Sequence, residues 1–268
     1  MNKRTAVVLS LILCLVLGAL RVADLCFLSD PATGFARVGE SWHRYLIVAA
    51  AAVVLFLLSR GASVRPLPFK HCRPALGCAM LLTAALLFET SVSTLLTQLD
   101  GFATLRGVLL LANGLWFAGF GVQAFFAPPT KSPPAALCLG GLAAPIWVAI
   151  ERFAIRPSSL ARTGHVLGVL SILAALCCVD YLLKMIFLPG APFGKAMTFT
   201  GMLAFLLCTC MELPETMISY ASGGATLLDL VQSGCWASVG LCGLVGAIYA
   251  SGEDRKDLPL FKIPADGQ

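Results

Sequence analysis

Charged side chains are scarce in this 268-residue chain and make up only 12% of it. A water-soluble domain usually carries about a quarter charged residues, so the chain has too little polar surface to cover a soluble globule. Histidine is also scarce, with three residues, and neither H-E-x-x-H nor G-x-S-x-G occurs. The motifs of a zinc protease and of a serine hydrolase are therefore missing. The sequence does not indicate whether the protein binds a cofactor or a metal, and a membrane enzyme is the least favoured of the functions considered below.

Hydrophobic residues, in contrast, make up 58% of the chain and fall into long blocks. About 20 apolar residues in a helix span the hydrocarbon core of a bilayer, and the alternating ten-residue pattern of a barrel strand is absent. The blocks therefore predict an all-α, polytopic transmembrane helical bundle in contact with lipid. We expect about eight spans, at Thr5 to Leu28, Trp42 to Leu58, 75–97, 106–126, 135–155, 164–187, 196–218 and 225–250.

These spans predict one transmembrane domain, 1–250, followed by a polar cytoplasmic tail, 251–268. A faint internal similarity divides the domain further. His43 precedes Glu89 by nearly the same interval that separates His165 from Glu212, and an Ala-Thr-Leu stretch follows each acid. Two four-helix halves of the same orientation, 1–134 and 135–250, would form a parallel repeat, which is a known membrane architecture.

The net charge of +5 could indicate nucleic acid binding in a soluble protein, but here the basic residues mark topology. Arg60, Arg65, Lys70 and Arg73 crowd one loop, and Lys and Arg are enriched in cytoplasmic loops. We therefore expect this loop to be cytoplasmic and the protein to lie in the cell membrane without a nucleic acid partner. Because the number of spans is even, both termini are expected to be cytoplasmic too.

Charged groups inside the spans are the candidate functional residues. Each costs roughly 2.5 to 3.5 kcal/mol on insertion, and such groups usually face the bundle interior or a watery cavity. Most of them lie in the half of the bundle away from the basic loop. The candidate binding residues for an ion or substrate are Glu89, Glu212, Glu215, Arg21, Arg152, Glu151 and Asp229. We expect the first five to face one shared chamber, and we expect the adjacent Glu151 and Arg152 to pair with different helices.

The most specific pattern is Glu212-Leu213-Pro214-Glu215 in the seventh span. Pro214 removes a backbone donor and frees a carbonyl near position 210, and two Glu at i and i+3 share a helix face. Carboxylates beside a free carbonyl suit a cation or a proton. The alternative is a pair of acids at a frayed helix end, neutralised by Arg21 or Arg152. In the other half, Asp180 and Lys184 are spaced to pair on one helix face.

The stretch Leu20-Arg21-Val22-Ala23-Asp24, followed by Asp30-Pro31-Ala32-Thr33-Gly34-Phe35, resembles the start of polytopic membrane proteins of Clostridia-type bacteria. The resemblance implies a bacterial cytoplasmic-membrane protein and carries no activity or site residue. Two functions remain open beside the enzyme. A small cation- or proton-coupled transporter explains the in-span acids, whereas a non-catalytic sensor or membrane protein partner explains the lack of any motif.

Overall fold

A computed structural model of the chain describes residues 3–30, 41–61, 73–97, 100–126, 136–154, 163–187 and 193–250. Helices are the regular elements in these ranges. In chain order they are α1 (Lys3–Ala23), η1 (Asp24–Leu28), α2 (Ser41–Ser59), α3 (Pro74–Thr97), α4 (Gly101–Gln123), α5 (Ala136–Ala154), α6 (Thr163–Phe187), α7 (Gly194–Ala204), η2 (Phe205–Glu212), α8 (Leu213–Ala221) and α9 (Leu227–Ala250). The expected tail, 251–268, lies outside the described residues.

The predicted helical membrane bundle is confirmed. Since η1 continues α1, and η2 and α8 continue α7, the described segments form eight long helical rods, one for each predicted span. Seven of them are long and apolar enough to cross a membrane, and α5 is the eighth. One boundary was wrong: the fourth rod begins at Gly101 and not at 106. Arg106 therefore lies inside the helix and not at its edge.

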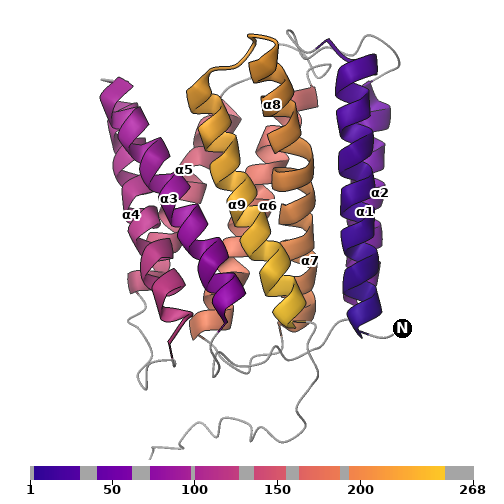
Figure 1. The fold of residues 1–268 in the computed structure, drawn as a ribbon, viewed down its shortest axis with the longest axis horizontal. Helices are drawn as coiled ribbons and strands as arrows, with labels where there is room; N and C mark the ends of the chain where they lie inside the picture. The colour runs from indigo at the N-terminus through magenta and orange to yellow at the C-terminus, as the bar shows by residue number, and fades with distance from the viewer. Residues whose placement is uncertain are drawn as a thin grey trace, which may run out of the picture.

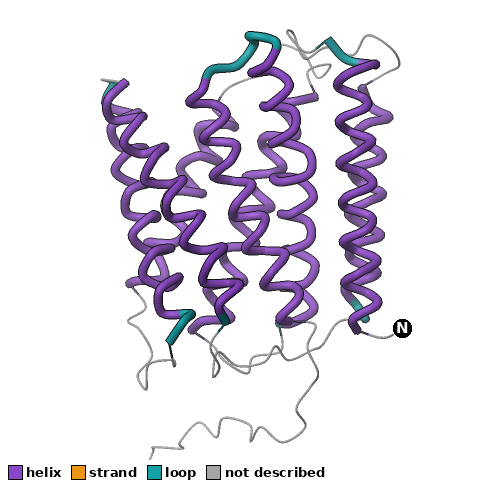
Figure 2. Tube along the Cα trace, viewed as in Figure 1, coloured by secondary structure: helices purple, strands orange, loops and turns teal. Residues whose placement is uncertain are grey.

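The rods stand side by side in one bundle (Figures 1 and 2). α1 and α2 form one flank and α3 and α4 the other, with the remaining rods between them. α1 packs on η2, α2 packs on α7, and α3 packs on both α4 and α9. The first residues of α1 and the last residues of α9 lie at the same end of the bundle, and α8 lies at the opposite end (Figure 1). We call this second end the α8 end.

The outer surface of the bundle is apolar, as contact with lipid requires. Large hydrophobic side chains such as Phe27, Leu96 and Phe102 are exposed. A single exposed apolar residue is ordinary in a soluble protein, but an apolar surface along whole helices is not. The rod from α7 through α8 is the most buried of the seven candidate spans, whereas α2 is the least buried. The central rod therefore forms the core around which the other helices pack.

Glycines let α7 and α9 cross at very close range. A Cβ atom at Gly201 would overlap the carbonyl group of Gly243, and a Cβ atom at Gly243 would lie 2.8 Å from the Gly201 oxygen. On the side of this crossing toward the α8 end, the hydroxyl of Thr209 donates a hydrogen bond to the carbonyl of Ala237 at 2.8 Å. Close backbone approach and interhelical hydrogen bonds drive association in lipid, where the hydrophobic effect between helices is absent. This crossing fixes the central rod against α9.

The central rod changes its hydrogen-bond pattern midway. From Phe205 to Glu212 it is a π-helix, and the Leu213 amide donates to the carbonyl of Cys208, five residues earlier. Pro214 then follows in the first turn of α8 and has no amide hydrogen to donate. A π segment of this kind is rare and often lies at a functional site. The rod therefore stays helical through Ala221, and its irregular part is the π-helix that begins at Phe205, before the proline.

Candidate functional site

Eight charged side chains meet in the half of the bundle toward the α8 end, and we call them the ion-pair cluster. They come from five of the eight rods. Its members are Arg21, Asp24, Arg44, Arg106, Glu151, Arg152, Glu212 and Glu215. Each takes part in at least one ion pair with another member.

Arg21 on α1 connects the first two rods to α8. Its guanidinium donates to Asp24 at 2.6 Å and to Glu215 at 2.8 Å, and also to the hydroxyl of Thr163 at 3.2 Å. Arg44 on α2 binds the same Asp24 at 2.7 Å. Arg21 is only 6% exposed, so its charge depends on these partners. Asp24 and Arg21 each pair with two charged side chains, so the four groups form a chain in the order Arg44, Asp24, Arg21 and Glu215.

The second group lies around Glu212, the last residue of η2. Arg152 on α5 donates to Glu212 at 2.7 Å, to the hydroxyl of Ser171 at 3.1 Å and to the carbonyl of Gly168. Ser171 in turn donates to Glu212. Glu212 lies about 7 Å from the midpoint of its 28-residue span, counted at 1.5 Å per residue. This pair therefore lies well inside the expected membrane core.

The first half of α6 is the platform for both groups. Thr163 and Ser171 supply hydroxyl groups, and Gly168 supplies a carbonyl. A Cβ atom at Gly164 would overlap the Oε1 atom of Glu215, so a side chain at this position would push the carboxylate away from the helix. The two Glu at i and i+3 thus face the same helix, as the sequence predicts.

The third group lies on the other face of α5. Glu151 accepts a hydrogen bond from the indole of Trp147 at 2.9 Å and pairs with Arg106 on α4 at 3.6 Å. The adjacent Arg152 pairs with Glu212 on the central rod. The prediction that these neighbours bind different helices is therefore confirmed. The predicted pairing of Asp180 with Lys184 on one helix is also confirmed, since they form an ion pair at 2.6 Å on α6, away from the cluster.

Positive and negative charges in the cluster are equal in number. Four acids, Asp24, Glu151, Glu212 and Glu215, face four guanidinium groups. Arg44 and Arg106 are not among the candidate residues that the sequence indicated. Three buried nitrogens in the cluster, Arg21 Nε, Arg44 Nη1 and Arg106 Nε, have no acceptor among the described residues. The cluster is therefore neutral but keeps hydrogen-bond donors without an acceptor. A water molecule or a polar solute can accept hydrogen bonds from them.

Two candidate residues form no hydrogen bond or ion pair with the cluster in the described part of the chain. Asp229 is in the first turn of α9, where its carboxylate accepts hydrogen bonds from the amide and hydroxyl of Thr226 at 2.9 and 2.7 Å. The Asp229 amide donates back to the Thr226 hydroxyl, so the two residues form a capping box that stabilises the helix start. Glu89 is exposed on α3, where a shallow depression lies beside it. The structure thus brings together four of the five residues expected to share a chamber.

These helices and charges define the class: a multi-pass helical membrane protein with a buried, neutral ion-pair cluster in one half of the bundle. Comparison of the chain with protein-family models, curated proteins and solved structures gives no match.

Proposed function

We propose that this protein is a small proton- or cation-coupled carrier and that the ion-pair cluster is its binding site. The observation that carries the proposal is the irregular segment of the central rod, a π-helix that ends at Glu212 just before Pro214, where two of the cluster's four acids lie. In membrane carriers, discontinuous helices place substrate and ion sites near the bilayer midplane. Charged residues in a span are costly and mark ion pathways. A π segment ending on a paired carboxylate combines both features.

The shared partners in the cluster suit reversible binding. A proton or cation that binds Glu215 neutralises the carboxylate, and Arg21 then keeps Asp24 and Thr163 as partners. The guanidinium therefore loses one ion pair without becoming an isolated buried charge, which would be far more costly. α1 and α8 are held together through this same Arg21 to Glu215 contact. Ion binding at Glu215 would thus loosen the contact between the first rod and the central rod.

Transport by the purified protein in vesicles of phosphatidylethanolamine and phosphatidylglycerol tests the proposal. We expect a proton flux, followed with a lumenal pH dye under a potassium diffusion potential, or a Na⁺ current after a concentration jump. Glu215→Gln is expected to reduce the flux to that of protein-free vesicles, because it removes the charge that binds the ion. Asp180→Asn is the matched control, since it changes a carboxylate to an amide in an ion pair outside the cluster.

Wild-type vesicles that pass neither protons nor Na⁺ would contradict the carrier proposal. Equal fluxes in wild type and in Glu215→Gln would place the pathway elsewhere and contradict the assigned site.

We further propose that the protein lies in a bacterial cytoplasmic membrane with both termini in the cytoplasm. The ends of α2 and α3 that flank the basic segment lie at the same end as the start of α1 and the end of α9 (Figure 1). Positive charge next to short loops favours the cytoplasmic side. The α8 end, with the ion-pair cluster, would then face outward.

Labelling with a membrane-impermeant maleimide tests this orientation. A cysteine introduced by Ser63→Cys is expected to react only after the cells are permeabilised. Cys26 is an exposed native thiol at the α8 end and is expected to react in intact cells, which makes it the internal control. Labelling of the Ser63→Cys site in intact cells would reverse the proposed topology.

A further inference from the structure

A buried polar side chain without a partner lies at the middle of α4. Asn113 is one residue from the midpoint of this helix, about 1.5 Å along its axis, so it lies at the depth of the bilayer midplane. Its side chain is 0% exposed. Neither its amide nitrogen nor its amide oxygen has a hydrogen-bond partner in the part of the chain that the structure describes. Because buried polar groups are normally hydrogen-bonded to protein or to ordered water, Asn113 indicates a bound molecule at this depth.

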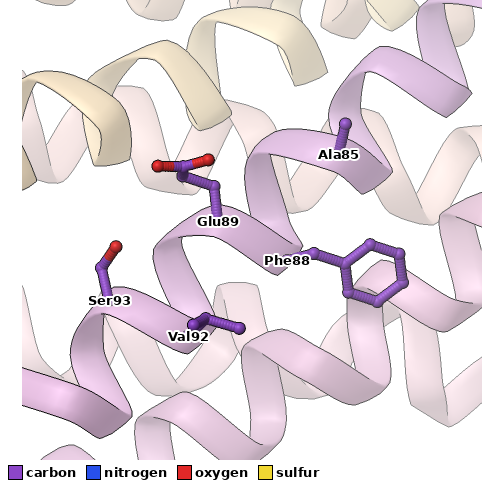
Figure 3. Close-up of a pocket in the computed structure, with 5 residues that line it drawn as sticks. All are labelled: Ala85, Phe88, Glu89, Val92 and Ser93. Atoms are coloured by element: carbon purple, nitrogen blue, oxygen red, sulfur yellow. The ribbon is translucent and has the colours of Figure 1, made fainter.

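Asn113 faces the inside of a ring of five helices. α3 packs on α4, α4 on α5, α5 on α6, α6 on α9, and α9 on α3. A Cβ atom at Gly114 would lie 2.9 Å from Phe88, which projects from α3 (Figure 3), whereas Trp116 contacts α5. Asn113 lies between these two contact sides, about 160° around α4 from the exposed Leu115. The amide of Asn113 therefore points into the ring and away from lipid.

A second donor without an acceptor lies one turn from Asn113. The indole nitrogen of Trp116 is buried and has no acceptor among the described residues. The atoms on both sides of this nitrogen lie against α5, since an added Cβ would be 3.6 Å from Cδ1 at Gly140 and 3.0 Å from Cε2 at Gly141. Pro145, four residues after Gly141, has no amide hydrogen, so the Gly141 carbonyl lacks its usual helical donor. The same contact thus holds an unpaired donor and a carbonyl that can accept.

We propose that Asn113, Trp116 and the Gly141 carbonyl hold water at the bilayer midplane. The Asn113 amide offers two donors and one acceptor group, the indole offers one donor, and the carbonyl is an acceptor. The occupant must therefore both donate and accept hydrogen bonds, and it must fit inside a closed ring of helices. An anion would leave the Asn113 oxygen and the carbonyl without donors. Water meets both requirements, because a buried water usually makes about three hydrogen bonds to such groups.

The water site extends the polar groups of the ion-pair cluster into the bundle. Arg106 precedes Asn113 by seven residues, which is two turns and about 10 Å on the same side of α4. The Nε atom of Arg106 also lacks an acceptor among the described residues. Water at Asn113 therefore brings hydrogen-bonding groups from the cluster to the midplane, the depth at which carriers bind their substrates. The water site does not depend on the carrier function, and its test needs no transport.

Water-edited solid-state NMR of the full chain in lipid vesicles tests the proposal. Labelling tryptophan with 15N gives an indole signal for each of the four tryptophans, and Trp116→Phe identifies one of them by its loss. We expect water magnetisation to reach the Trp116 indole hydrogen nearly as fast as it reaches Trp42, which is 50% exposed. An absence of transfer to Trp116 would overturn the proposal, because the site would then be dry.

Variants of Asn113 locate the water. Asn113→Leu removes the amide and is expected to reduce the transfer to Trp116 several-fold, whereas Asn113→Ser keeps a polar group, leaves more room and is expected to retain it. Thr83→Val is the matched control, since it removes a buried hydroxyl of the same ring that already donates to the Ala79 carbonyl. It should leave the Trp116 signal unchanged. Unchanged shifts of the other three indoles show that a variant is folded. Equal transfer in folded Asn113→Leu and in the wild type would overturn the proposal, because Asn113 would then hold no water at Trp116.

Discussion

Replacing Arg152 by leucine is expected to lower the free energy of unfolding by about 3 to 5 kcal/mol, the usual cost of removing one partner of a buried ion pair. Arg152 donates to Glu212, to Ser171 and to the carbonyl of Gly168. Without it, the Glu212 carboxylate keeps only a hydroxyl partner inside the bundle. Equilibrium unfolding in mixed micelles measures the change.

Two comparisons decide whether the buried charge is the cause. Lys184→Met removes an ion pair whose side chains are 40% and 39% exposed, and an exposed pair contributes at most about 1 kcal/mol. The double variant Arg152→Leu with Glu212→Leu removes both charges together, so it is expected to recover much of the loss. Equal losses in Arg152→Leu and Lys184→Met, or no recovery in the double variant, would contradict this account.

Replacing Gly201 by leucine is expected to cost roughly 3 kcal/mol of stability, at the upper end of the range for inserting atoms into a packed core. The first added atom already overlaps the carbonyl of Gly243, so α7 and α9 must separate. That movement would also weaken the hydrogen bond from Thr209 to Ala237. Unfolding in the same mixed micelles gives the value.

Gly119 provides the control, because a Cβ atom there meets no other atom within 4 Å. Gly119→Leu is expected to leave stability nearly unchanged, apart from the helix propensity that any residue gains over glycine. If the two leucine variants were equally stable, the close crossing of α7 and α9 would not be what holds the central rod in place.

The positions of the spans could be predicted because they depend on local composition alone. A hydrocarbon layer of fixed thickness requires about 20 apolar residues in each helix, and that requirement can be counted along the chain. Arg106 shows the limit of this reasoning. The charge of Arg106 was taken to mark the edge of a span, but Arg106 lies inside the helix, where it forms an ion pair with the Glu151 carboxylate on α5. The internal repeat, 1–134 and 135–250, stays a prediction.

The candidate site could be predicted in part. The free-energy cost of a charge in lipid indicated that Glu212, Glu215, Arg21 and Arg152 avoid lipid. In the structure these four side chains lie against α6. The platform on α6 was missed, although Gly164, Gly168 and Ser171 repeat at helical spacing in the sixth span. Glycine and serine at such spacing are common in membrane helices, so the pattern by itself does not single out a site.

Composition and the positions of the charged residues were enough to predict a helical membrane bundle with most of its costly charges in one half. Both follow from the free energy of placing each residue in hydrocarbon, which depends on residue type and depth. Which charges pair, and the exposed position of Glu89, could be seen only once the helices were packed together. Pairing depends on which helix faces meet, and those are set by close crossings such as Gly201 against Gly243, where backbone distance and not composition selects the neighbour.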